Sequence, residues 1–374
     1  MSAKVAAGLS AHLVIMNTWG FVNSFGVFQA YYTDLLSRSP SDISWIGSVQ
    51  VSLTFFLSTF TGRLSDAGYF HHLIISGAAL LVVGAFTTSA CTQYWQFLLA
   101  QGFCTGIGCG LIFCPTMAVV TTYFEKNRAL ALGFVSCGAS VGGLIYPAMG
   151  RNLLPTLGFS WTYRVMGFVQ LATILVPLAL AKPRMPPRKS GPLVDLASFK
   201  ELDYTFWITG FFFVSPCYSS HYSFRIPLLT WCQNFSGLYI LFYYLAPFGR
   251  DSVHPSMSYS DSLNLLMIVN GVSIIGRLLP NKLADKVGPV NLMIPTAFIC
   301  GVACFCWIAV TSPTGIYIWT GTCGIILGTL QSMFPAGLAS LNRDPRKAGT
   351  KLGSKKVLKF GVCSIYFPQC GDLV

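Results

Sequence analysis

The sequence predicts an all-α polytopic membrane protein, and two observations lead to this prediction. Of its 374 residues, 53% are hydrophobic and only 10% are charged, a composition that a soluble domain of this length does not need. Lys and Arg gather in five clusters, separated by long stretches with almost no charge. The clusters lie at Arg63, at Lys126 and Arg128, across 182–200, at Lys282 and Lys286, and across 343–351.

The spacing of these clusters predicts that all of them lie on one side of a membrane. Most neighbouring clusters are about 60 residues apart, which is room for two apolar spans of about 20 residues each. Two crossings return the chain to the side it left. Short basic loops favour the cytosol, so we expect a multi-pass protein, of the plasma membrane, with a cytosolic N-terminus. This bias explains the net charge of +12, and no nucleic-acid partner is expected.

Ten apolar stretches are predicted to be spans. They cover 9–33, 43–62, 73–91, 95–121, 129–150, 160–181, 204–248 (interrupted), 261–281, 290–311 and 314–340. The first is too long for the core of a signal peptide. The basic, proline-containing stretch 182–203 is a predicted cytosolic linker. It separates an N-terminal bundle, 1–181, from an incomplete C-terminal bundle, 204–353, which an aberrant tail, 354–374, follows.

The two halves share features at an offset of six spans. The loop after the second span begins GRLSD at Gly62, and the loop after the eighth contains LADKVG from Leu283. Spans four and ten each carry closely spaced glycines and then a proline, Pro115 and Pro335. Such an offset indicates internal duplication. The alternative is that glycine is simply frequent in membrane helices.

The duplication is interrupted at two places. Residues 214–236 put His221, Arg225 and Gln233 inside the seventh span, where charge is costly. We hypothesise a retained intron; the alternative is an extracellular insertion with a glycosylated Asn234. The second place is the end of the chain, where the residues after 343–351 are too few and too mixed for the two further spans that duplication predicts.

Several stretches together resemble the major facilitator superfamily and, within it, the fungal monocarboxylate-transporter-like branch. They are YFEKNRALALGFVSCGASVGGLIYP from Tyr123, NTWGFVNSFGVFQAYY from Asn17, SPSDISWIGS from Ser39 and GRLLPNKLADKVGPVN from Gly276. The resemblance covers roughly 13–213 and 237–353. The branch's acidic-Gly-Gly-Trp start of span one is absent before His12.

The resemblance implies the major facilitator fold, with two six-helix bundles that rock about a central cavity. Here the last two helices are lacking and the seventh is interrupted. We expect a secondary active or facilitative transporter of a small organic acid or related metabolite, with symport as one of its modes. One alternative is efflux of a fungal secondary metabolite, and a second is the non-functional product of a mis-spliced gene. The five histidines are scattered, so neither an enzyme nor a metal or cofactor site is expected.

Arg277 is the foremost substrate-binding candidate. It lies in an otherwise uncharged part of span eight, about two turns before Asp285. An arginine inside a span usually faces a cavity or a partner, and its planar fork suits a carboxylate. The resemblance implies that the span-eight arginine binds the substrate's carboxylate. The alternatives are that Arg277 extends to the cytosolic surface or braces Asp285.

Asn23, Asn270, Gln331 and Tyr243 complete the predicted substrate site. The amides could hydrogen-bond a ligand, although polar residues in membrane helices also join helices, and tyrosines also line interfaces. No Asp or Glu falls in the middle of a span. In animal monocarboxylate carriers a lysine and an aspartate occupy positions that correspond to Asn23 and Ser273 here. Whether a proton accompanies the substrate is therefore left open.

The loops after spans two and eight predict a gate. Asp66 can accept hydrogen bonds from the N–H groups at a helix amino terminus and pair with an Arg, which would latch the two halves in one state. Asp285 would do the same in the second half. The alternative is a static loop salt bridge. The gating candidates are Gly62, Arg63, Asp66, Arg128, Asp285 and Lys286.

Overall fold

The structure is a computed structural model, which describes residues 2–124, 126–186, 245, 248–250, 253–307 and 309–341. These parts of the chain are helical, and no strand occurs among them. Six of their helical stretches are long and apolar enough to cross a membrane. The prediction of an all-α polytopic protein is therefore confirmed.

The first crossing is a helix with two local changes of geometry. It consists of α1 (Ala3–Ile15), the π-helical turn η1 (Met16–Gly20), α2 (Phe21–Asn23) and α3 (Phe25–Leu36). Side-chain hydroxyls bond back to the backbone at both changes: Thr18 Oγ1 donates to Val14 O (2.9 Å) and Ser24 Oγ to Gly20 O (2.8 Å). Such bonds compete with the helical ladder and bend helices.

The next two crossings form a hairpin of α4 (Pro40–Leu64), η2 (Ser65–Tyr69) and α5 (Phe70–Thr88). Ser39 caps α4 by accepting from Asp42 N (3.1 Å), and Pro40 occupies the first turn. The chain turns at Gly68, whose φ of 103° suits glycine. The fourth crossing comprises α6 (Tyr94–Phe97), η3 (Leu98–Thr105) and α7 (Gly106–Tyr123).

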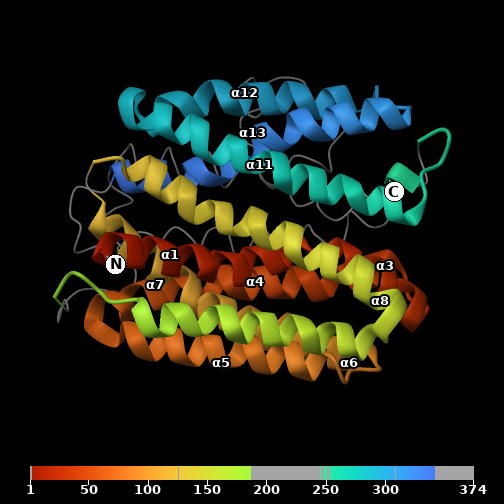
Figure 1. The fold of residues 1–374 in the computed structure, drawn as a ribbon, viewed down its shortest axis with the longest axis horizontal. Coiled ribbons are helices and arrows are strands. Elements are labelled where there is room, and N and C mark those ends of the chain that lie inside the picture. Colours follow the sequence, from red (N-terminus) through yellow and green to blue (C-terminus); the bar gives the residue numbers. More distant parts are fainter. Residues whose placement is uncertain are drawn as a thin grey trace.

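The helix α8 (Arg128–Leu180) contains two crossings. The backbone leaves the helical region at Gly158 (φ 73°, ψ 173°), between the predicted spans 129–150 and 160–181. Figure 1 shows the first run in yellow and the returning run in green. The first run, 128–157, lies between the other N-terminal helices and the C-terminal ones.

The C-terminal helices are α11 (Tyr259–Val287), α12 (Pro289–Trp307) and α13 (Pro313–Leu341). The first run of α8 separates these three helices from α4, α5 and α7 (Figure 1). Most of the predicted seventh span, the insertion 214–236 and the tail 354–374 fall outside the described residues. The division into two bundles joined by 182–203 stays a prediction.

The outermost of these helices presents an apolar surface. On α12, the side chains of Phe298, Ile299, Val302 and Phe305 are all exposed. Lipid tolerates such a surface, whereas the backbone polar groups of a spanning helix are satisfied internally. We infer that this side of α12 faces lipid.

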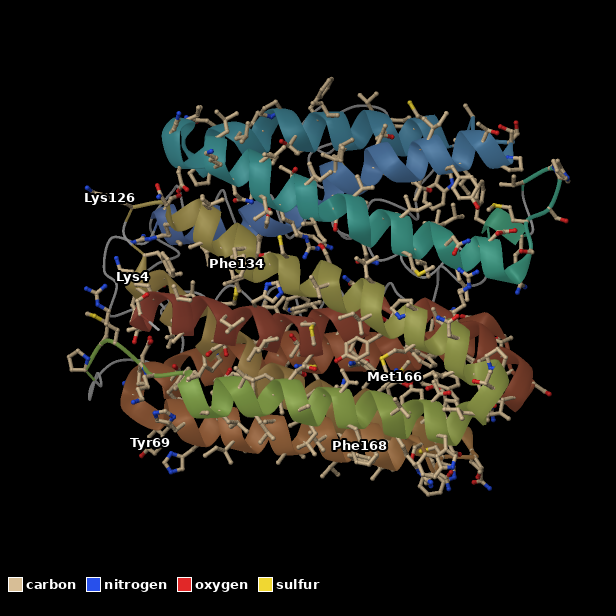
Figure 2. The ribbon with its side chains drawn as sticks, viewed as in Figure 1. Lys4, Tyr69, Lys126, Phe134, Met166 and Phe168 are labelled. Carbon is tan, nitrogen blue, oxygen red and sulfur yellow. The ribbon has the colours of Figure 1, made fainter. Side chains whose placement is uncertain are left out.

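Several basic clusters meet at one end of the molecule, which we call the basic end. Lys4, Tyr69 and Lys126 lie at this end in Figure 2. Tyr123 Oη donates to Lys182 O (3.1 Å), and Asp285, beside Lys286, bonds the backbone next to Arg128. The structure thus brings the clusters at 126–128, 182 and 282–286 together, as the spacing predicts.

Candidate functional site

The first run of α8 packs along α11 in the opposite direction, and we call this contact the α8–α11 seam. Its polar and close contacts join Arg151 with Asn264, Gly143 with Asn270, Ser140 with Ser273, Ser136 with Arg277, and Ala129 with Asp285. Each step along α8 is matched by an almost equal step back along α11. The two helices are therefore in contact from the basic end to the opposite end.

Glycines on α8 set the closeness of this seam. A Cβ on Gly133 would lie 2.3 Å from Arg277 O, and one on Gly143 would lie 2.4 Å from Asn270 Oδ1. Neither distance leaves room for a side chain. Small residues allow helix backbones to approach this closely in membranes.

A second pair of glycines packs α8 against the first crossing. A Cβ on Gly138 would lie 2.1 Å from His12 O, and one on Gly142 would lie 2.5 Å from Met16 O. These contacts run in the same direction along both helices. The first run of α8 thus lies between α1 and α11, with glycines on both faces.

Arg277 lies where α8, α11 and α13 meet. Its side chain is only 1% exposed. Nη1 donates to the carbonyl of Ser136 on α8, and Nη2 donates to Oε1 of Gln331 on α13. The structure therefore brings together two predicted site residues, Arg277 and Gln331, through neutral oxygens.

The helices α11 and α13 run parallel through this junction. A Cβ on Gly328 would lie 2.4 Å from Ser273 O, and Thr329 Oγ1 donates to Gly276 O (2.9 Å). The glycines that the sequence places on span ten thus serve close packing against span eight. This packing holds Gln331 beside Arg277.

The two predicted asparagines are buried, but in different places. Asn270 is 0% exposed, and its Nδ2 donates to Leu266 O (2.8 Å). Asn23 is 2% exposed at the end of α2. Within the described residues, Oδ1 of Asn270 and Nδ2 of Asn23 make no hydrogen bond. Each such group costs about 1–3 kcal/mol, which favours a state that supplies a partner. Tyr243 lies outside the described residues.

The seam also holds polar residues that the sequence did not single out as site residues. Asn281 is 0% exposed, and its Nδ2 donates to Arg277 O (2.7 Å) and Ser332 Oγ (2.6 Å). Asn281 could have been found from the sequence, because it lies four residues after Arg277 and therefore on the same face of the helix. Ser140 Oγ and Ser273 Oγ lie 2.6 Å apart. Ser273 is thus half of a neutral hydroxyl pair.

At the basic end, Asp285 of α11 caps the amino terminus of α8. Its Oδ1 accepts from Ala129 N (2.8 Å) and its Oδ2 from Leu130 N (3.0 Å). The residue preceding α8, Asn127, has a φ of 44° and makes no side-chain cap. A carboxylate from another helix therefore takes the place of a local N-cap and meets the positive end of the helix dipole.

Arg128 makes the reciprocal contact with the end of α13. Its Nη1 donates to Ala339 O (3.1 Å), and its Nε donates to Phe124 O (3.0 Å). A cation at a helix carboxyl end is favourable for the same electrostatic reason. We call these two contacts the helix-end clamp, formed by Asp285 on α8 and Arg128 on α13.

The remaining gating candidates also lie at the basic end. Gly62 and Arg63 are buried near the end of α4, Asp66 is half-buried in η2, and Lys286 is exposed in the last turn of α11. Their gating roles stay predictions. In the described part of the chain, no group of three or more His, Cys, Asp or Glu side chains could hold a metal ion.

A further polar network joins α1 and η1 to α8. Tyr146 Oη donates to Asn17 Oδ1 (2.7 Å), and Asn17 Nδ2 donates to Thr173 Oγ1 (2.9 Å). Tyr146 and Asn17 are both 0% exposed. This network links the two runs of α8 to the first crossing, so Tyr146 serves the packing of these helices.

Comparison with known proteins identifies the family. The profile of the Major Facilitator Superfamily matches residues 9–354. A protein of Gibberella zeae named MFS-type transporter is 47% identical over 92% of this chain and 74% of its own length. The aspyridones efflux protein apdF of Emericella nidulans is 33% identical over 92% of this chain and 66% of its own length. The agnestins efflux protein AgnL12 of Paecilomyces divaricatus is 32% identical over 87% and 70%.

Solved structures agree in fold. Two structures of FucP, one described as the E. coli fucose:proton symporter, match all of this chain with TM-scores of 0.66 and 0.68 at 15% identity. The match covers 97% and 92% of those chains. The relatives named above are transporters and efflux proteins, and none of their names mentions a monocarboxylate. The finer branch assignment is therefore not specifically supported, but the profile and the relatives show that this chain belongs to the Major Facilitator Superfamily.

Proposed function

We propose that this protein exports an acidic fungal secondary metabolite from the cytosol by alternating access. This proposal replaces the expectation of small organic acid transport. Two relatives are named as efflux proteins, for aspyridones and for agnestins, and these names favour the efflux alternative. The observation that carries the acidic part of the proposal is the buried guanidinium of Arg277.

A cation inside a membrane-spanning helix is costly and usually serves transport. The Nη atoms of Arg277 donate to a carbonyl of α8 and to the amide oxygen of Gln331. If α8 moves away from α11, the bond to Ser136 breaks and Nη1 becomes available to an anion. A carboxylate or an acidic enol could then accept two hydrogen bonds from the planar fork.

The helix-end clamp would control this movement. Asp285 and Arg128 join α8 to α11 and α13 at the basic end. The excess of basic residues in short loops favours the cytosol for this end. Breaking the clamp would open the site to the cytosol, and separation of Arg151 from Asn264 would open it to the opposite side. Proton coupling is left open in this proposal.

Metabolite profiling of a strain that lacks the gene tests the proposal. We expect at least one acidic metabolite to accumulate in the cells and to fall in the medium, and the full gene to restore its export. Arg277→Gln should fail to restore export. Lys282→Gln, which removes an exposed charge from the same helix, should restore it.

Two results would count against the proposal. Unchanged metabolite levels in cells and medium would remove export as the function. Full restoration by Arg277→Gln, with normal amounts of protein in the membrane, would remove Arg277 from the substrate site.

A further inference from the structure

Two asparagines of α11 share one arrangement on either side of Arg277. Asn270 and Asn281 are both 0% exposed. Each Nδ2 donates to the carbonyl four residues earlier, at 2.8 Å for Leu266 O and 2.7 Å for Arg277 O. The two residues are 11 positions apart, which is about three helical turns. Both side chains therefore lie on the same face of α11.

Each asparagine packs against a glycine of α8. The nearest atoms to a Cβ on Gly143 belong to Asn270, at 2.4 Å, and Asn281 Cβ lies 3.1 Å from a Cβ on Gly133. Oδ1 of both asparagines accepts no hydrogen bond within the described residues. Because each Nδ2 is assigned by its bond to a carbonyl, the unpaired atom is the oxygen. Glycine has no side chain to offer, and the N–H groups inside α8 serve its own helix.

We propose that Asn270 and Asn281 are two acceptor subsites that select substrates with hydroxyl or N–H donors beside their acidic group. The inference rests on the proposed role of Arg277. Asn270 lies seven residues from Arg277 and Asn281 lies four residues from it, which is about 10 Å and about 6 Å along the helix axis. The substrate class is thus an elongated hydroxylated acid, with a donor at one of these separations from the anion.

A purely structural role explains only part of this arrangement. An asparagine that joins two helices uses its amide across the interface, as Asn281 Nδ2 does with Ser332 on α13. Towards α8, Asn270 presents an oxygen that α8 does not satisfy. Oδ1 of Asn281 is also buried and accepts no hydrogen bond in the described part of the chain, although the side-chain atoms of Asn281 nearest to Gly133 are Cβ and Nδ2. Opening of the seam would expose these oxygens beside the guanidinium, where a donor on the substrate can reach them.

Binding of paired acids to the purified full chain tests the inference. The first pair is 4-hydroxycinnamate and cinnamate, which differ only in a hydroxyl far from the carboxylate. We expect the hydroxylated acid to bind about five- to tenfold more tightly, as one added hydrogen bond allows. Asn270→Leu should abolish this difference, so that the two acids bind with equal Kd values.

A second pair addresses Asn281. The pair is 3-hydroxybenzoate and benzoate, whose hydroxyl lies closer to the carboxylate, and Asn281→Leu should abolish its preference. The matched control is Asn291→Leu, because Asn291 makes the same bond to a carbonyl four residues earlier, Val287 O at 2.9 Å, on an exposed part of α12. It should retain both preferences.

The outcomes separate this inference from the proposed function. Equal Kd values within both pairs for the unsubstituted protein, no binding of any of the four acids, or a preference that survives in the leucine variants would overturn the acceptor subsites. Arg277→Gln should weaken the binding of cinnamate and benzoate as well. If it does so while the members of each pair bind equally, the anion site stands without the acceptor subsites.

Discussion

At the scale of single residues, four glycines of α8 determine how closely its neighbours approach. Gly138 and Gly142 face the first crossing, whereas Gly133 and Gly143 face α11. At each of them an added Cβ would lie 2.1–2.5 Å from an atom of the neighbouring helix. Three of these four contacts are with backbone oxygens, which cannot rotate away.

Gly138→Ala should destabilise the protein by on the order of 1–3 kcal/mol, because the added Cβ overlaps His12 O and the helices must separate. Thermal denaturation in detergent measures the effect as a lower midpoint. Gly8→Ala is the control, since a Cβ there meets nothing within 4 Å. Equal midpoints for the two variants would show that α1 can shift without a loss of stability.

At the scale of elements, the helix-end clamp joins helices that are distant in sequence. The amino end of α8 lacks its own cap and receives the carboxylate of Asp285, while Arg128 reaches a carbonyl near the end of α13. Each contact pairs a charge with the helix end of opposite polarity. The clamp therefore stabilises the contact of α8 with α11 and α13 at the basic end.

Asp285→Ala should open the basic end more often. A charged cap contributes about 1–2 kcal/mol, so we expect the reaction of Cys137 with a maleimide to be about five- to thirtyfold faster. Cys137 is a suitable reporter because it is 4% exposed in the seam, with Sγ 4.0 Å from Ile274 O. Mass spectrometry would follow labelling at this residue.

The control for this experiment is Asp261→Ala, which removes a carboxylate at the opposite end of α11, where Ser258 Oγ donates to it (2.7 Å). This control variant should leave the rate at which the maleimide labels Cys137 unchanged. Equal rates for Asp285→Ala and the unsubstituted protein would show that the clamp does not hold the seam closed.

At the scale of the whole molecule, the proposed alternating access predicts that the α8–α11 seam opens during each transport cycle. A cross-link between Ser140→Cys and Ser273→Cys should block export, because the native hydroxyls lie 2.6 Å apart at mid-seam. The background should carry Cys137→Ser to prevent a competing disulfide. Export by complemented cells, before and after a reductant, measures the block and its reversal.

Each single substitution serves as a control and should export under both conditions. A complete cross-link, verified by mass spectrometry, with undiminished export would show that the seam need not separate during transport.

The arrangement in the membrane gives a further prediction for the whole molecule. Lys126 and Lys286 belong to clusters that the structure places at the basic end. An impermeant amine reagent added to intact cells should leave both unlabelled and should label both after permeabilisation, because short basic loops stay in the cytosol. Labelling of one from outside and the other only from inside would refute the common-side topology.

The helices could be predicted from hydropathy because lipid demands long apolar segments. Span eight, predicted to end at residue 281, continues to Val287 in α11, since polar residues at the basic end extend the helix beyond the apolar stretch. The break between the fifth and sixth spans falls at Gly158, where only glycine tolerates the backbone angles well. Arg277 was recognisable because a charge in an apolar run is costly.

The sequence by itself determined that this chain crosses a membrane repeatedly, that the basic loops among its described residues share one end and that Arg277 is unusual. These properties follow from the length, hydropathy and charge of each segment, which can be read from the sequence without knowing which helices are in contact. Only the tertiary structure decided that Arg277 meets Gln331, that Asp285 caps α8 and that Asn270 and Asn281 face glycines. Such contacts depend on the rotation and register of packed helices, which arise from close packing between segments far apart in the chain.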